Sequence, residues 1–295
     1  MVDALSAIEA HFGVNSLITR VTEEDLVRQA IDLAARTRRQ IEAAELHITE
    51  FAQVAALFQV TVCTGELPEG KDGSYLKDER RIILSSSVTT PERINFTFCH
   101  ELMHSRIEDD GDLLSDFADA HRRSDEAAME RLCNAGAAEV LLPAEDVRQF
   151  DCSVALIPEL SERFFASSIA VALQMINCAD DARYLVIAEL RTVIVAPATP
   201  LDPYNRIGDR LVVVYGAKSP AAKYFIRRNR HLPLDHGLYH AMLQPETALK
   251  MDAEVPIGDN PWPLPCECLY FRQKVFAFFH EPSRNAVSPD QMRMF

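Results

Sequence analysis

The chain has 295 residues and a net charge of −14, and this charge argues against broad binding to the phosphate backbone of nucleic acids. Hydrophobic residues make up 48% of the chain, so we expect packed domains rather than disorder, with room for two domains and a small third element. The sequence has no apolar run that could span a bilayer, no secretory signal pattern and no C-x-x-C among its seven cysteines. We therefore expect a cytoplasmic protein with reduced thiols.

The first part of the chain predicts helices followed by a small sheet. Residues 21–45 are rich in Ala, Leu, Glu and Arg with helical periodicity, which predicts one or two surface-packed helices. A second periodic stretch at 51–58 leads into a β-type run at 60–62. After a turn-rich segment, two short strands near 71–75 and 81–84 predict a hairpin.

The next segment carries the strongest chemical signal of the sequence. Residues 96–104 read F-T-F-C-H-E-L-M-H, which places H-E-x-x-H inside an apolar helix that we expect to begin at Thr90. His100 and His104, four residues apart, lie on one helix face and can bind one divalent metal, usually zinc. Glu101 can then take a proton from a metal-bound water, as in metal-dependent peptidases. Such side chains can also be solvated, but a helix that is apolar on most sides is buried, and buried charges need partners.

A third ligand has to come from farther along the chain, because the third histidine of the elongated metzincin motif is absent. A helix rich in small residues is predicted over 126–139 and offers Glu130, with Asn134 one turn away to orient a ligand. Glu139 points to the opposite side of this helix, so only one of the two glutamates can face the metal. The sequence favours Glu130. His121 is a third candidate, although its polar surroundings predict a solvated loop residue.

These residues together resemble the ImmA/IrrE metallopeptidase family. The resemblance rests on F-T-x-x-H-E-x-x-H at 96–104, L-L-S-D at 113–116 and E-x-L-C-N-x-x-A-A-x-x-L-x-P at 130–143. It covers a core from about residue 73 to 143 and is weaker elsewhere. Cys99 and Met103 stand where the family usually has small residues, but this difference leaves every expected ligand in place.

The resemblance implies a function. His100, His104 and Glu130 would bind Zn²⁺, with Mn²⁺ as an alternative, Glu101 would act as the catalytic base, and Glu139 would be structural. The implied substrate is an XRE-family (helix-turn-helix) transcriptional repressor of the DdrO type, whose cleavage releases DNA-damage and radiation-response genes.

Two other functions remain open: a DNA-binding regulator with a structural metal site, and a ligand-sensing regulator with a vestigial peptidase domain. The acidic charge and the lack of a basic recognition helix argue against direct DNA binding. The complete set of expected ligands and base argues against a vestigial site.

The rest of the chain predicts a helical connector and a strand-rich domain. Residues 156–165 and 167–174 resemble a helix-turn-helix, but the second segment offers Gln174 and no Lys or Arg, so a packing helix of similar shape is the better interpretation. A short helix is predicted at 239–243. The predicted strands are 183–188, 192–195, 211–215, 269–271 and 275–279.

We therefore predict an α+β protein of three parts. A zincin-like metallopeptidase domain spans 1–145 and a helix-turn-helix-like connector spans 146–181. A GAF-like sensor domain, as the resemblance implies, spans 182–295.

Weaker patterns are interpreted as structural. His231, His236 and His240 lack a supporting carboxylate or cysteine pattern, so we expect ordinary polar surface rather than a second metal site. The hairpin before the H-E-x-x-H helix can hold an extended substrate by adding it to the sheet, but plain sheet structure is slightly favoured.

Overall fold

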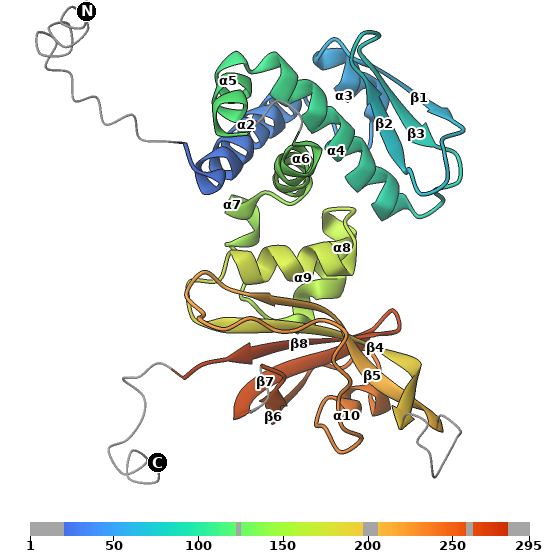
Figure 1. Cartoon of the computed structure of the whole chain (residues 1–295), viewed down its shortest axis with the longest axis vertical. Coiled ribbons are helices and arrows are strands. Elements are labelled where there is room, and N and C mark those ends of the chain that lie inside the picture. The colour runs from blue at the N-terminus through green and yellow to red at the C-terminus, as the bar shows by residue number, and fades with distance from the viewer. Residues whose placement is uncertain (1–20, 122–124, 197–205, 258–261, 283–295) are drawn as a thin grey trace, which may run out of the picture.

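The structure is a computed structural model that describes residues 21–121, 125–196, 206–257 and 262–282. Figure 1 shows a helical part with a small sheet at one end, a larger sheet at the other, and a pair of helices between them. Within these residues, no helix has both the length and the apolar character needed to cross a membrane.

The first two helices follow the predicted periodicity. Helix α2 (Glu23–Ala43) begins with a reciprocal capping box between Thr22 and Asp25 and buries its apolar face against α4, α5 and α6. Helix α3 (Phe51–Leu57) follows after a turn and contacts the first strand. The helices predicted in 21–45 and 51–58 are thus confirmed.

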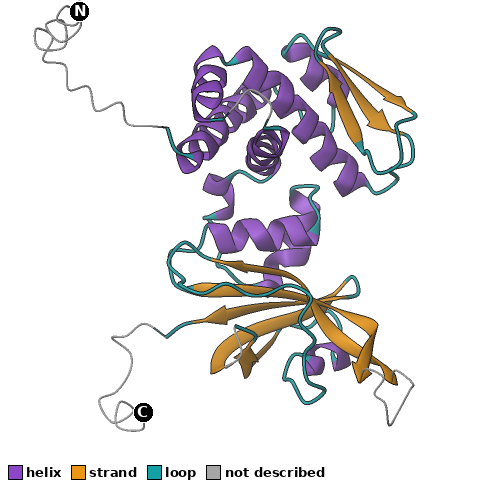
Figure 2. Cartoon of the chain, in the orientation of Figure 1, coloured by secondary structure: helices purple, strands orange, loops and turns teal. Residues whose placement is uncertain are grey.

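The small sheet has three strands in the order β1-β3-β2. Strand β1 (Thr61–Gly65) is parallel to β3 (Arg81–Ser85), and β2 (Gly73–Leu76) is antiparallel to β3, which confirms the predicted hairpin. Strand β2 is therefore an edge strand, and it contacts helix α4 (Pro91–Asp109) (Figure 2).

Three more helices complete this part of the chain. Helix α6 (Glu126–Leu141) was predicted, whereas α5 (Gly111–Ala120) was not, and α7 (Ala144–Val147) follows after Pro143. The acidic run after His104 indicated only a helix exit. In the structure Asp110 accepts a hydrogen bond from the Leu113 N–H at 3.1 Å and caps α5 at once.

The connector packs into the core and presents no recognition helix to solvent. A 3₁₀ turn (Val154–Leu156) leads into α8 (Ile157–Arg163) and α9 (Ser168–Asn177). Gln174 is 9% exposed, and its amide donates to the Leu142 carbonyl at 2.9 Å. The polar side chain that the sequence singled out on α9 therefore bonds inside the protein.

The second sheet is antiparallel, with the order β5-β4-β8-β7-β6. The strands predicted at 183–188 and 192–195 are one continuous strand, and β6 was missed because its residues alternate with charged ones. The short helix α10 (Tyr239–Leu243) lies where it was predicted. The strands are β4 (Arg183–Ala196), β5 (Arg206–Lys218), β6 (Leu249–Val255), β7 (Trp262–Phe271) and β8 (Lys274–His280).

Two hydrophobic cores lie on opposite faces of this second sheet. One core contains Phe276 and Phe278 of β8 and continues without a break through α8 and α9 into the helical part. The other contains Val275 and Phe279 and is covered by α10 and the loops around it. The alternation along β8 thus places successive side chains in different cores.

The second sheet also touches the N-terminal turn of α4. Arg272, in the turn between β7 and β8, donates to a carboxylate oxygen of Glu92 at 2.7 Å. Farther along α4, the side-chain amide of Asn95 donates to the carbonyl of Phe165 at 2.9 Å. Helix α4 is therefore in contact with both the connector and the C-terminal sheet.

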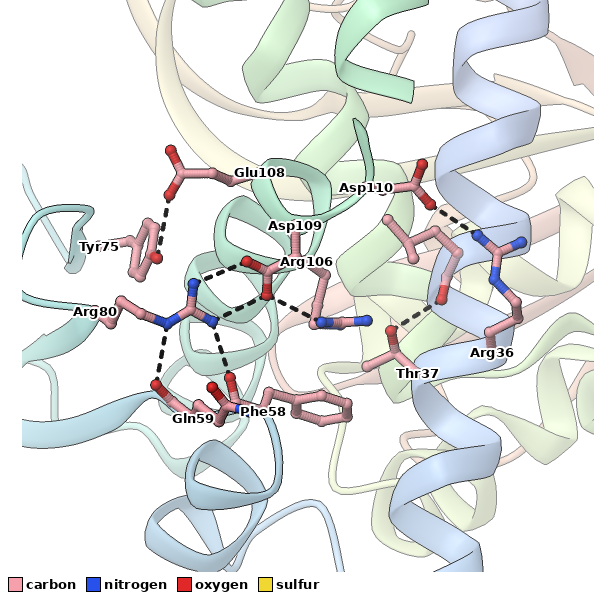
Figure 3. Close-up of polar contacts among 11 residues, drawn as sticks. Arg36, Thr37, Phe58, Gln59, Tyr75, Arg80, Arg106, Glu108, Asp109 and Asp110 are labelled. Carbon is pink, nitrogen blue, oxygen red and sulfur yellow. Dashed lines mark hydrogen bonds and ion pairs between the residues drawn. The ribbon is translucent and has the colours of Figure 1, made fainter. Parts of the chain in front are cut away.

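At the other end of α4, one arginine joins three elements (Figure 3). The guanidinium of Arg80 donates to both carboxylate oxygens of Asp109, at 2.8 and 2.9 Å, and to the carbonyls of Gln59 and Phe58, at 3.1 and 3.0 Å. This links the turn between β2 and β3 to the ends of α3 and α4. The bidentate pair lowers the pKa of Asp109.

We expect Arg80→Ala to lower the free energy of unfolding by about 2 kcal/mol, because it removes hydrogen bonds to a charged partner and to two carbonyls. Urea denaturation at pH 7 measures this loss. The loss should shrink as the pH falls below about 4, because protonation of Asp109 removes the same ion pair in the wild type.

Arg36→Ala is the matched control. Arg36 makes one exposed ion pair with Asp110 at 3.0 Å (Figure 3), so its loss should cost less than about 1 kcal/mol. Equal losses of unfolding free energy in the two variants would show that the additional hydrogen bonds of Arg80 add nothing to stability.

Candidate metal centre

Helix α4 places His100, Glu101 and His104 close together near its middle. Its N-cap Thr90 is extended, and Pro91 occupies the first turn, where a missing N–H costs nothing. Glu101 is 7% exposed, whereas the side chains of His100 and His104 are 13% and 23% exposed and line a cavity. The motif thus lies at the border between core and solvent.

Helix α6 brings a carboxylate to the two histidines. The N-cap of this helix is Asp125, whose side chain accepts a hydrogen bond from the Ala128 N–H at 3.0 Å. Its buried residues include Ala128, Gly136 and Ala137, and a Cβ at Gly136 would lie only 2.6 Å from the end of Met103 on α4. This close approach of the two helices lets Glu130 reach across to the histidine face.

The three side chains converge on a common point. One Glu130 oxygen is 3.1 Å from His100 Nε2 and the other is 3.4 Å from His104 Nε2, while the two imidazole nitrogens are 3.2 Å apart. All three ligand atoms lie within 4.8 Å of one another. Two ligands of one tetrahedral zinc ion are separated by about 3.3 Å. The spacing and the nitrogen and oxygen donors therefore fit a single zinc-sized cation.

The hydrogen bond of His100 and the surroundings of His104 also fit a cation. Asn134 Oδ1 is 3.0 Å from His100 Nδ1 and can only accept, so Nδ1 carries the proton and Nε2 presents its lone pair. Burial lowers the pKa of His104, and the nearby His100 acts in the same direction. A lowered pKa favours the neutral form of His104, which is the form of an imidazole that binds a cation.

Glu101 lies beside this group in a poorly solvated position. Burial raises its pKa to about 7, and the carboxylate of Glu130 adds to the rise, while the Tyr75 backbone N–H and Lys71 act in the opposite direction. A carboxylate with a pKa near neutrality can both accept and return a proton at physiological pH.

The cavity over these residues has a volume of about 320 Å³. Strand β2 and the segment before it form one wall, and the start of α6 forms another. Lys71, Gly73, Tyr75 and Glu126 were not singled out by the motifs, although a glycine inside a strand pattern indicates a close backbone approach. The lining residues are Lys71, Gly73, Ser74, Tyr75, His100, Glu101, His104, Glu126 and Glu130.

The other two candidate ligands lie elsewhere. Glu139 is buried and accepts hydrogen bonds from the Ala144 N–H at 3.1 and 3.2 Å, close to the Gln174 amide. His121 is not the solvated loop residue that we expected, because its ring packs on Phe117, one turn earlier in α5, and its Nδ1 lies 3.3 Å from Asp125.

The C-terminal histidines form no second group. Among the residues that the structure describes, the group of three around His100 is the one cluster of candidate ligands. His236 is buried rather than on the surface, since its Nε2 bonds to the Glu254 carbonyl at 2.8 Å. All seven cysteines are free thiols.

Comparison with known proteins identifies the chain. The pattern of the IrrE N-terminal-like domain, a peptidase M78 family, matches residues 55–175. The radiation response metalloprotease IrrE of Deinococcus deserti is 30% identical over 229 residues, which cover 74% of this chain and 77% of that protein. The chain belongs to the IrrE metalloprotease family. IrrE of Deinococcus radiodurans is 38% identical over 110 residues, or 35% of this chain and 33% of that protein.

Membership of the IrrE family supports a metal-dependent protease role. A solved structure, a Mycobacterium tuberculosis transcriptional regulator, is similar over 88% of this chain and 81% of that chain, with a TM-score of 0.53 and 14% identity. This second likeness concerns the fold alone.

The contact between Gly136 and Met103 can be tested directly. Alanine improves helix propensity over glycine by about 0.8–1.0 kcal/mol, but overpacking a core costs about 1–3 kcal/mol, and Met103 is fully buried. We therefore expect Gly136→Ala to lower the free energy of unfolding, measured by urea denaturation. Adding Met103→Leu should recover part of the loss.

Gly111→Ala serves as the control, because nothing lies within 4 Å of a Cβ at that helix start. This variant should be neutral or slightly more stable. If Gly136→Ala behaves in the same way, the two helices are not in tight contact at this point.

Proposed function

We propose that this IrrE family member is a zinc-dependent endopeptidase with His100, His104 and Glu130 as the metal ligands. The observation that carries the proposal is the convergence of these three side chains, from two helices, next to a buried glutamate. Three protein ligands leave one position of a tetrahedral site open, as in catalytic rather than structural zinc sites.

The residues around the ion have separate roles in this proposal. A divalent metal supplies Lewis-acid chemistry, lowering the pKa of water and polarising a carbonyl. Glu101 accepts the proton of the attacking water and returns it to the leaving amine, a role typically worth about 10² to 10⁴ in rate. Asn134 orients His100 through its Nδ1. Manganese is the alternative cation.

The edge strand beside the site suits an extended substrate. Strand β2 pairs with β3 on one side only, and its residues 73–75 line the cavity. Its outer edge offers backbone donors and acceptors to a peptide that adds to the sheet. We therefore propose that the scissile segment binds in extended form along β2, next to Glu101.

As the substrate we propose an XRE-type helix-turn-helix repressor of the DdrO kind, cut to release DNA-damage and radiation-response genes. Support comes from the family and from the radiation response metalloproteases among its relatives. The test is to incubate the chain and zinc with the XRE-type repressor encoded nearest its gene. One discrete cut supports the proposal, and an intact repressor contradicts it.

The remaining parts of the proposal concern organisation and location. We place the metallopeptidase domain at 1–145, the helix-turn-helix-like connector at 146–181 and a GAF-like sensing domain at 182–295. The antiparallel sheet with helices on both faces supports the last of these. The free thiols of all seven cysteines support a reducing compartment such as the cytoplasm.

Glu101→Gln should retain zinc and lose repressor cleavage by about 10² to 10⁴-fold, because the amide cannot accept the proton. Glu130→Ala should lose both zinc and cleavage, because a ligand is removed. Metal content by mass spectrometry and cleavage by gel densitometry separate the two effects. Normal cleavage by Glu101→Gln would show that another group is the base.

Removal of the metal gives an independent prediction. Dialysis against a chelator should abolish cleavage, and zinc should restore it, since the three ligands hold the ion reversibly. The midpoint temperature of thermal unfolding should rise when zinc is added back to the wild type, but not when it is added to Glu130→Ala. An unchanged midpoint in the wild type would contradict zinc binding by these residues.

A further inference from the structure

The first residue of strand β2 lies directly against the glutamate of the motif. A Cβ built on Gly73 would be 2.5 Å from Thr97 Cγ2, 2.9 Å from Glu101 Cγ and 2.9 Å from Glu101 Oε1. Thr97 and Glu101 are four residues apart on α4, so one helix face carries both contacts. Among the described glycines, two lie this close to the H-E-x-x-H motif. Gly73 lies against Glu101, and Gly136 lies against Met103.

Neither partner can easily make room for a side chain at this position. Thr97 and Glu101 are both 7% exposed, and a β-branched threonine in a helix has few alternative rotamers. Carbon atoms in contact are normally about 3.5–4.0 Å apart, so the Thr97 methyl would have to move by about 1 Å. Movement of Glu101 would shift the carboxylate oxygen itself.

The strand is also unable to withdraw. Gly73 pairs with Leu84 in the ladder between β2 and β3, and the preceding carbonyl of Asp72 accepts from the Ser85 N–H at 2.8 Å. The Asp72 carboxylate in turn accepts from Arg93 of α4 at 2.7 Å. The start of β2 is therefore fastened both to the sheet and to the helix that carries the motif.

We propose that Gly73 is a positioning residue for the proposed peptidase reaction. By lacking a side chain, it lets the strand pass close enough to define where the Glu101 carboxylate stands relative to the metal ligands. The inference rests on the assignment of Glu101 as the base in the proposed function. Gly73 itself contributes no chemical group.

The test compares Gly73→Ala with wild type, using the full chain, zinc and the XRE-type repressor. We expect kcat to fall about 10²-fold, the loss typical of a misplacement of about 1 Å, with KM and zinc affinity unchanged. In the Glu101→Gln background the same substitution should cause no further loss, because there is no base left to displace.

Two companion variants separate positioning from folding. Gly65→Ala is a matched glycine change in the same sheet, where a Cβ would contact Ile83 at 3.2 Å and nothing of the motif; it should retain kcat. Gly73→Ala combined with Thr97→Ser removes the methyl contact and leaves the contact with Glu101. It should regain thermal stability but not kcat.

Crystal structures of Gly73→Ala and wild type give a readout that does not depend on activity. The proposal expects the Glu101 carboxylate to be displaced while His100, His104 and Glu130 stay in place. An unmoved Glu101, an unchanged kcat, or an equal loss in the Glu101→Gln background would each overturn it. If the wild type does not cleave the repressor, the proposed function is wrong. The position of the Glu101 carboxylate in the two crystal structures still tests whether Gly73 positions it.

Discussion

The separation between helices α4 and α6 determines whether a metal centre can exist in this protein. The two helices contact where the Met103 side chain of α4 packs directly against Gly136 of α6, which has no side chain of its own. Glu130 lies 3.1 and 3.4 Å from the two imidazoles, and we expect a larger residue at this crossing to push the helices apart and lengthen these distances. The arrangement depends on tight packing at Gly136, between one and two helical turns from Glu130, because a rigid helix transmits a displacement along its length.

A second constraint comes from the opposite side of α4. Strand β2 covers Glu101 and removes it from water, which raises the pKa of the carboxyl group and limits where it can stand. Two neighbours of α4 thus have different roles: α6 carries the proposed ligand Glu130, and β2 confines the proposed base Glu101. In both contacts a glycine permits an approach that any larger residue would prevent.

Much of the helical part could be predicted from the sequence, because periodicity and capping are local signals. The start of α4 at Thr90 and the hairpin before it are examples. Helix α5 was missed because Asp110 both follows one helix and caps the next, so an acidic run looked like a simple exit. Strand β6 was missed because its alternating charged residues do not look like a buried strand.

The sequence could predict which three candidate ligands lie together, but not what surrounds them. The spacing of His100 and His104, and the helical geometry that favoured Glu130, follow from one period of 3.6 residues. The contact between Gly73 and Glu101 joins residues 28 positions apart through a strand and a helix, and no local pattern specifies that distance. His121 was misjudged for a related reason, because the ring of Phe117 shields it only once α5 has formed.

The hydrophobic core that runs from α2 through α9 into one face of the C-terminal sheet has a consequence for dissection of the chain. A fragment ending near residue 145 would lack α9 and the C-terminal sheet, and it would expose to water the hydrophobic surface that they cover. Such a fragment would aggregate rather than behave as a free-standing enzyme. Because this core is shared, we expect the helical part and the C-terminal sheet to unfold together.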